Sequence, residues 1–436
     1  MKLNIFKNKV AKNAGWIIIT RIIQAVLALV INMLTARFLG PSNYGLINYA
    51  ASVVAFATPI MSLGFANVLV QEYVNHPEEE GKILGTSVLL SFFSSIACIG
   101  GVFAFTLVAD AGQKVTNIVV LLYSLMLITQ AFELIQYWYQ AKLLSKYMAI
   151  VSLIAYILVS GYKTVLLILK ADVYLFALAN SIDYLLIAVF LLVFYKKLGG
   201  QRISFSGEIG KRMFAKSRHY IVSSLMVTIF AQTDKIMLKQ MIDESAVGYY
   251  SAAVSCAGMT SFVFTAIIDS FRPVIFEHKK NGDQTGYELN IERLYSIVIY
   301  LALLQSIVMT ILSPFIIRVL YGGDYQASIL ALQIIVWYTT FSYMGAVRNV
   351  WILGEGKQKY LWILNLGGAL ANIVLNFILI PFWGIYGAAV ASLITQVFTN
   401  IFMNAIVWPL KHNNMLILKS LNPKLIIELL RGYEHS

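Results

Sequence analysis

Apolar residues form long, repeated runs along this chain, separated by short segments that contain charges, glycine or proline. A helix needs roughly 20 apolar residues to cross a bilayer. We predict twelve membrane-spanning helices, at residues 15–39, 44–70, 84–108, 115–140, 148–169, 173–195, 218–242, 248–272, 294–320, 327–353, 360–380 and 384–408. The pattern leaves no room for a soluble domain and predicts an all-α polytopic membrane protein.

The first of these helices carries a polar stripe. Residues 15–39 are mostly apolar, yet Arg21, Gln24, Asn32 and Thr35 fall on one side of the helix at about 100° per residue. Polar groups in hydrocarbon are costly unless they face protein or water. We therefore expect this helix to form one wall of a polar cavity inside the bundle.

Composition supports a membrane protein. Of the 436 residues, 59% are hydrophobic and 12% are charged, against about 25% charged in soluble domains. The net charge of +12 could indicate nucleic-acid binding, but it lies in short connections between apolar runs, which argues against that partner. Cys98 and Cys256 both lie in apolar runs, so neither a disulfide framework nor a metal site is expected.

The distribution of lysine and arginine predicts the topology. With the N-terminus inside, 24 of the 33 Lys and Arg residues lie in the tails and inner connections, and five lie in the outer ones. Both termini are therefore expected in the cytoplasm. We predict an N-terminal six-helix lobe at 1–200, a cytoplasmic connecting loop at 201–217, a C-terminal six-helix lobe at 218–410 and a cytoplasmic tail at 411–436.

Charged residues inside the predicted spans are the strongest candidates for function, because each is costly in the membrane unless it is paired or hydrated. Since they come from several helices, we expect a shared aqueous chamber. The candidates for coupling to a proton or sodium ion are Glu133, Asp183, Asp234, Lys235 and Asp269. Structural pairing is an open alternative for Glu133.

Arginines near the predicted cytoplasmic side indicate a phosphate-bearing or carboxylate-bearing cargo, because a guanidinium stays charged and matches phosphate oxygens bidentately. The candidates are Arg21, Arg272 and Arg348. Arg272 precedes Pro273 at a predicted span end, so contact with phospholipid headgroups is as strong an interpretation as contact with the cargo. For Arg348, pairing with another side chain for structural reasons is nearly as strong an interpretation as contact with the cargo.

Amide side chains accompany these arginines. Gln24, Asn32, Asn372 and Asn376 would suit sugars. The segment Gly354–Lys359 lacks the spacing of a phosphate loop, so we expect neither ATP binding nor another cofactor, and no enzyme activity.

Four motifs carry a resemblance to a known family: ARFLGPSNYG (Ala36–Gly45), AQTDKIML with AVGYYSAA (Ala231–Ala253), YGGDY (Tyr321–Tyr325) and NIVLNFILIPFWGIYGAAVAS (Asn372–Ser392). They span both halves of the chain. The chain resembles the O-antigen and polysaccharide flippases of the multidrug/oligosaccharidyl-lipid/polysaccharide (MOP) exporter superfamily.

The resemblance implies two six-helix lobes around a central cavity, working by alternating access without ATP in the bacterial cytoplasmic membrane. It implies an undecaprenyl-diphosphate-linked oligosaccharide as cargo, moved from the inner to the outer leaflet for O-antigen, lipopolysaccharide or capsule assembly. Membrane lipids, a polymerase and glycosyltransferases are the implied partners. By position, the diphosphate-binding role would fall to Arg21 and Arg272, with Arg348 third.

Two rival functions remain open from the sequence. A cation-coupled multidrug exporter of the same superfamily would favour cavity carboxylates and aromatic stacking, whereas basic residues here equal or outnumber acidic ones in the predicted chamber. A membrane glycan polymerase would need a catalytic site on the outer face, where the predicted connections are only a few residues long.

Overall fold

The structure is a computed structural model that describes the backbone of residues 2–425, and the side chains of residues 23, 24 and 27–425. In this part of the chain all regular structure is helical. Ten helical segments are long and apolar enough to cross a membrane. An all-α, multi-pass membrane protein is therefore confirmed, while the count of twelve spans stays a prediction.

Two of the ten segments contain a glycine kink where the sequence predicts a boundary between spans. In α1 (Lys2–Met61), Gly40 has φ 70° and ψ 173°. In α15 (Leu361–Val397), Gly384 has φ 56° and ψ −131°. These conformations strongly favour glycine, because a Cβ would clash with the backbone, so each long helix changes direction without an intervening loop.

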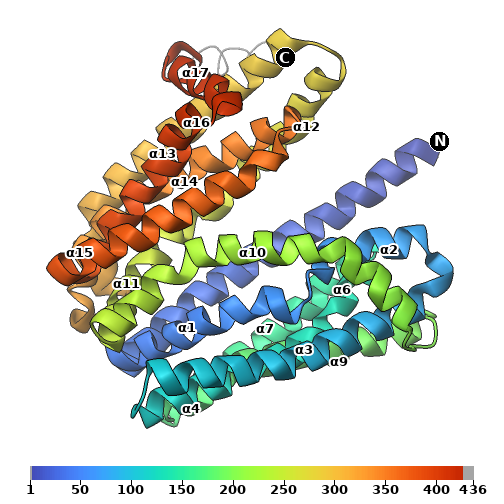
Figure 1. Ribbon diagram of the computed structural model, residues 1–436, viewed down its shortest axis with the longest axis horizontal. Helices are drawn as coiled ribbons and strands as arrows, with labels where there is room; N and C mark the ends of the chain where they lie inside the picture. Colours follow the sequence, from blue (N-terminus) through green and yellow to red (C-terminus); the bar gives the residue numbers. More distant parts are fainter. Residues whose placement is uncertain (1, 426–436) are drawn as a thin grey trace. The chain divides into compact units, whose positions relative to one another are not determined.

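The chain folds as two compact units, Met1–Gln232 and Thr233–Ser436, and the division falls within α10 (Figure 1). Besides most of α10 (Gly207–Met241), unit 1 contains α1, η1 (Phe65–Asn67), α2 (Leu69–Asn75), η2 (Pro77–Glu79), α3 (Glu80–Ala109), α4 (Lys114–Ser124), α5 (Met126–Phe132), η3 (Glu133–Ile135), α6 (Gln136–Ala141), α7 (Ser145–Ile168), α8 (Val173–Ala177) and α9 (Ala179–Lys197).

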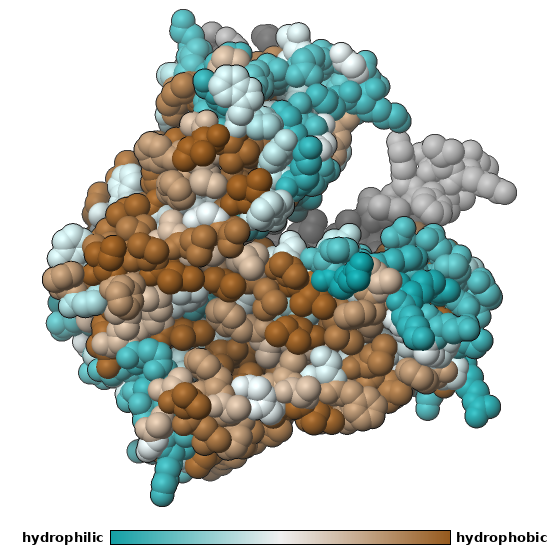
Figure 2. All heavy atoms as spheres, in the orientation of Figure 1, coloured by the Kyte–Doolittle hydropathy of each residue, from teal (hydrophilic) through white to brown (hydrophobic). Residues whose placement is uncertain are grey.

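Unit 1 is a helical bundle in which α1 packs against α7 and α4, and α5 packs against α9. Aromatic residues fill the core at one end, where Trp138 lies against Tyr139 and Tyr195. Its outer side chains are apolar: Val108 is 82% exposed and Ile168 is 74% exposed. Figure 2 shows apolar side chains over the middle of this unit and hydrophilic ones at its ends, as expected for helices that face lipid.

The segment before α10 is held firmly against α3. Residues 201–206 form no regular secondary structure, and the Ser204 N–H donates to the Gly81 carbonyl at 3.2 Å. A Cβ on Gly81 would lie 2.2 Å from the Arg202 carbonyl oxygen, and one on Gly85 would lie 2.3 Å from that of Ser204. Glycine at both positions therefore permits the close approach of this connection.

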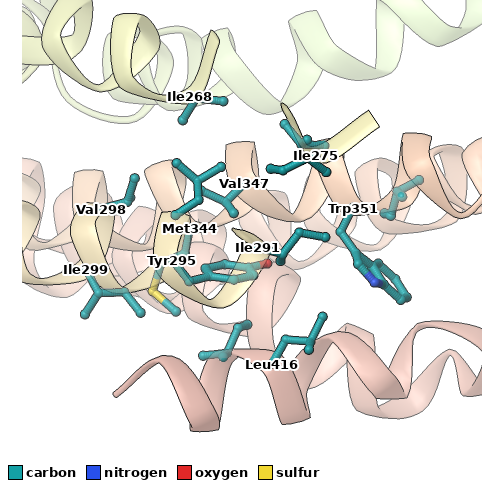
Figure 3. Packing of buried hydrophobic residues seen from close by; sticks show 14 of the residues in the cluster. Ile268, Ile275, Ile291, Tyr295, Val298, Ile299, Met344, Val347, Trp351 and Leu416 are labelled. Atoms are coloured by element: carbon teal, nitrogen blue, oxygen red, sulfur yellow. The ribbon is translucent and has the colours of Figure 1, made fainter. Parts of the chain in front are cut away.

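Unit 2 contains the end of α10 and α11 (Glu244–Ala257), η4 (Gly258–Thr260), α12 (Ser261–Lys280), α13 (Gln284–Leu320), η5 (Gly323–Tyr325), α14 (Ser328–Gly354), η6 (Gln358–Tyr360), α15, the π-helical turn η7 (Phe398–Phe402), α16 (Met403–Ile406), η8 (Trp408–Leu410) and α17 (Lys411–Ser420). Its core lies between α12, α13, α14 and α17. Figure 3 shows Tyr295 of this core between Met344 and Val347 of α14 and Leu416 of α17.

Candidate functional site

A buried acidic site surrounds Asp234, near the end of α10. Asp234 is only 8% exposed. Its Oδ2 accepts hydrogen bonds from the Tyr250 hydroxyl of α11 and the Ser392 hydroxyl of α15, both at 2.5 Å. Its Oδ1 accepts from the Asn376 side-chain amide of α15 at 2.6 Å. Three neutral donors on two helices therefore hold this carboxylate.

Two asparagines extend the site along α15. The Asn376 amide also donates to Asn372 Oδ1 at 3.1 Å, and the two side chains are 0% and 2% exposed. Asn376 Oδ1 has no hydrogen-bond partner among the described residues. Spacing of four residues places both on one face of the helix, beside Asp234. The sugar contact expected for these asparagines stays a prediction.

The oxygen atoms of this site fit a small hard cation or a proton. Asp234 forms no ion pair with a described lysine or arginine, although the adjacent Lys235 acts on it electrostatically. A buried carboxylate is costly unless it is paired, protonated or bound to a metal ion. Carboxylate, amide and hydroxyl oxygens are the ligands that hard cations prefer, and the unpartnered oxygen of Asn376 adds an acceptor.

A second polar cluster lies in unit 1, where α5 passes into α6 through the 3₁₀ turn η3. Glu133 begins this turn and interacts electrostatically with Asp183 of α9. Asp183 also interacts with Lys163 of α7. Two of the predicted ion-coupling residues and a lysine are therefore near enough to influence one another electrostatically.

Neutral side chains lie around this cluster, but they leave some of its oxygen atoms without hydrogen bonds. The Asn180 amide donates to the Tyr123 hydroxyl at 2.5 Å, and the Gln130 amide donates to the Tyr184 hydroxyl at 3.4 Å. Asp183 Oδ1 and Gln130 Oε1 are enclosed and have no hydrogen-bond partner in the described chain. Glu133 and Asp183 are both half-buried, so this cluster is less enclosed than the Asp234 site.

The predicted cargo-binding residues come from both compact units. The Arg21 side chain lies outside the described residues, although its backbone belongs to α1. Gln24 is half-buried and Asn32 is exposed. Arg272 is exposed on α12 and forms an ion pair with Asp269 at 3.2 Å, which joins a predicted cargo ligand to a predicted ion-coupling residue.

Arg348 is enclosed inside unit 2. Its side chain is 4% exposed, and one guanidinium nitrogen donates to the Thr399 carbonyl of η7 at 2.9 Å. Another donates to Asn349 Oδ1 at 3.2 Å. A cargo contact by Arg348 stays a prediction, and in this conformation the surrounding helices separate its side chain from the surface.

Sequence reasoning missed a group of buried charges at one end of unit 1. Glu72 of α2 is 0% exposed and accepts from Arg212 Nε at 3.0 Å and Lys216 Nζ at 2.6 Å. Arg212 also donates to Glu79 at 2.7 Å. These residues lie in predicted connections between spans, where charged residues are common, so the sequence contained no signal that Glu72 would be buried.

The fold has counterparts among solved structures of MOP-superfamily transporters. One is an inward-facing MATE multidrug resistance transporter, with a TM-score of 0.70 and 14% identity over 90% of this chain and 95% of that one. Another is the lipid II flippase MurJ, with a TM-score of 0.59 and 15% identity over 95% and 92% of the two chains. At sequence identities this low, the structural similarity establishes the fold alone.

The chain belongs to the family described as polysaccharide biosynthesis protein, whose model matches residues 10–279. The family expected from the four sequence motifs is thereby confirmed.

Two relatives of this chain are named for polysaccharide biosynthesis or O-antigen transport. The capsular polysaccharide biosynthesis protein CapF of Staphylococcus aureus is 21% identical over 88% of this chain and 96% of its own. A Shigella flexneri protein named as an O-antigen transporter is 20% identical over 88% and 94%. An uncharacterized membrane protein of Methanocaldococcus jannaschii, MJ1068, is 25% identical over 60% of this chain, and the match spans about half of that relative, 53%.

Proposed function

We propose that this protein is a flippase that moves an undecaprenyl-diphosphate-linked oligosaccharide from the inner to the outer leaflet of the bacterial cytoplasmic membrane. The family match over residues 10–279 carries this proposal. Relatives named for O-antigen transport and capsule biosynthesis support it, as does a fold shared with a lipid II flippase over 95% of the chain.

In this proposal the diphosphate is bound by arginines, and the isoprenoid tail stays in the bilayer. Arg272 is suited to the first contact because its side chain is 45% exposed and that of its partner Asp269 is 54% exposed. An exposed pair of this kind contributes little to stability, so a diphosphate can replace the carboxylate at low cost. Arg21, Gln24 and Asn32 on α1 complete the proposed cargo contacts, with both termini in the cytoplasm.

Transport is proposed to proceed by alternating access without ATP, coupled to a proton or sodium ion at Asp234. Tyr250, Ser392 and Asn376 orient the carboxylate, and the bound cation supplies the charge that this buried group lacks. Glu133 and Asp183 form a second proposed site for a proton.

A deletion strain tests the cargo directly. The oligosaccharide linked to undecaprenyl diphosphate is expected to accumulate on the inner leaflet, protected from a membrane-impermeant oxidant such as periodate until the cells are lysed. Normal export of unpolymerised units by the deletion strain would overturn the flippase proposal.

Arg272 variants test the diphosphate contact in the same strain. Arg272→Ala is expected to lower export strongly and Arg272→Lys to retain part of it, because lysine keeps the charge without the planar fork. Arg202→Ala is the matched control, since Arg202 is an exposed arginine outside the spans. Equal export by wild type and Arg272→Ala would remove Arg272 from the proposed site.

A multidrug exporter is the second candidate, because a MATE transporter is among the structural relatives. It predicts that the deletion strain becomes sensitive to cationic drugs while its surface polysaccharide is unchanged. The relatives named for polysaccharide biosynthesis favour the lipid-linked cargo.

A further inference from the structure

The surroundings of Arg348 contain a buried positive charge without a carboxylate to balance it. Arg348 is 4% exposed, and its guanidinium donates to two neutral acceptors, the Thr399 carbonyl and the Asn349 side-chain oxygen. No ion pair with a described aspartate or glutamate involves it, and its Nε has no hydrogen-bond partner among the described residues. Removing a guanidinium from water is costly unless a counter-charge is present.

Two other donors in the same region are also unpartnered. Trp351, one turn along α14 from Arg348, is 1% exposed, and Asn413 in the first turn of α17 is 0% exposed. Neither Trp351 Nε1 nor Asn413 Nδ2 has a hydrogen-bond partner in the described chain. The Trp351 ring lies 6.3 Å from that of His412, which places it beside the start of α17.

Tyr295 of α13 links these elements. Its hydroxyl donates to Asn413 Oδ1 at 2.9 Å, and its phenol is near enough to Arg348 to interact with it electrostatically. Figure 3 shows Tyr295 and Trp351 in the core beside α17. Arg348, Trp351 and Asn413 therefore belong to one buried region bounded by α13, α14 and α17.

The oxygen atoms of this region do not balance its positive charge. The unpartnered oxygens nearby are Thr399 Oγ1 and Asn404 Oδ1, and both are neutral. The three unpartnered N–H donors, on Arg348, Trp351 and Asn413, therefore outnumber the two unpartnered oxygens, and neither oxygen carries a negative charge to balance the guanidinium.

We propose that this region binds one small monovalent anion, with chloride as the abundant candidate, through Arg348, Asn413 and Trp351. The anion supplies the missing counter-charge and joins α14 to the helix that follows the last predicted span. This site is separate from the cargo contacts and from the cation site at Asp234.

Thermal unfolding of the purified full-length protein in detergent tests the proposal. At constant potassium concentration, chloride and bromide are expected to raise the unfolding midpoint by about 3 °C or more relative to gluconate. Arg348→Gln is expected to remove this difference. Arg202→Gln, an exposed arginine in unit 1, is expected to keep it. Equal midpoints of the wild type in chloride and gluconate would show that the region holds only water, and would overturn the proposal.

Asn413→Asp provides a variant that keeps the shape of the region in case Arg348→Gln fails to fold. The aspartate retains the oxygen that accepts from Tyr295 and brings a carboxylate into the region of Arg348. It is expected to match or exceed wild-type stability in gluconate and to lose the chloride response. A full chloride response in Asn413→Asp would contradict the proposal. In crystals grown in bromide, anomalous scattering is expected beside Arg348 in the wild type and absent in Asn413→Asp.

Discussion

Glu72 in unit 1 and Asp234 in unit 2 are both buried carboxylates, and their surroundings differ in kind. Glu72 is held by two cationic side chains, Arg212 and Lys216. Asp234 is held by the neutral hydroxyls of Tyr250 and Ser392 and the amide of Asn376. We expect the carboxylate that forms ion pairs within the chain to be structural, and the one that is held by neutral donors to be able to bind an ion.

The largest expected effect comes from removing the charge of Asp234. Asp234→Asn is expected to lower the affinity for the coupling ion about 30-fold or more, because a buried charged contact is lost. The protein is expected to stay folded, because asparagine matches aspartate in shape and removes a buried charge that has no ion-pair partner among the described lysines and arginines. Ion-dependent transport in proteoliposomes measures the first effect and thermal unfolding the second.

Asp243→Asn is the matched control for that experiment. Asp243 is exposed and caps α11 by accepting from the Ala246 N–H at 2.7 Å, and asparagine preserves that acceptor. Ion dependence retained in Asp234→Asn would mean that the two buried carboxylates do not differ in function as proposed.

Glu72→Gln is expected to lower stability and leave ion-dependent transport unchanged, the opposite of what is expected for Asp234→Asn. It leaves Arg212 and Lys216 facing a neutral amide at the end of α2, and we expect a loss of about 2 kcal/mol of stability, since hydrogen bonds to charged groups contribute about 1.5–3 kcal/mol. Thermal unfolding measures this change, and the ion dependence of transport should be preserved. Wild-type stability in Glu72→Gln would show that this ion-paired group is not structural.

The smallest effect is expected from Ser392→Ala, which removes one of the three donors to Asp234. Loss of one hydrogen bond to a charged group corresponds to about 1.5 kcal/mol, or roughly a tenfold weaker binding of the ion. Ser392→Thr retains the hydroxyl and serves as the control. An ion affinity in Ser392→Ala equal to that of wild type would exclude Ser392 from the site.

Much of the fold was predictable, because runs of apolar residues have few structures open to them in a membrane. Gly40 and Gly384 also lie at predicted span boundaries, although each boundary proved to be a kink inside a long helix. The sequence contained no signal that α10 would be shared between two compact units, dividing after Gln232, since its apolar pattern is continuous there.

The candidate site was predictable in part. Asp234 could be identified because a carboxylate in an apolar run is costly, and Asn372 and Asn376 because they share a helix face. Tyr250 and Ser392 could not be identified, since a hydroxyl in an apolar helix is common and its partner depends on packing between helices distant in sequence.

The ion pair between Asp269 and Arg272 could have been predicted from the sequence, because residues three apart are neighbours on a helix.

The kink in α15 lies between the two residues of that helix that bind Asp234. Asn376 precedes Gly384 and Ser392 follows it, and both donate to the same carboxylate. The Asp234 side chain therefore bridges the two arms of α15 across the bend. A change in the angle between the arms would move these two donors relative to each other, so binding of the proposed ion at Asp234 is expected to respond to the curvature of the helix.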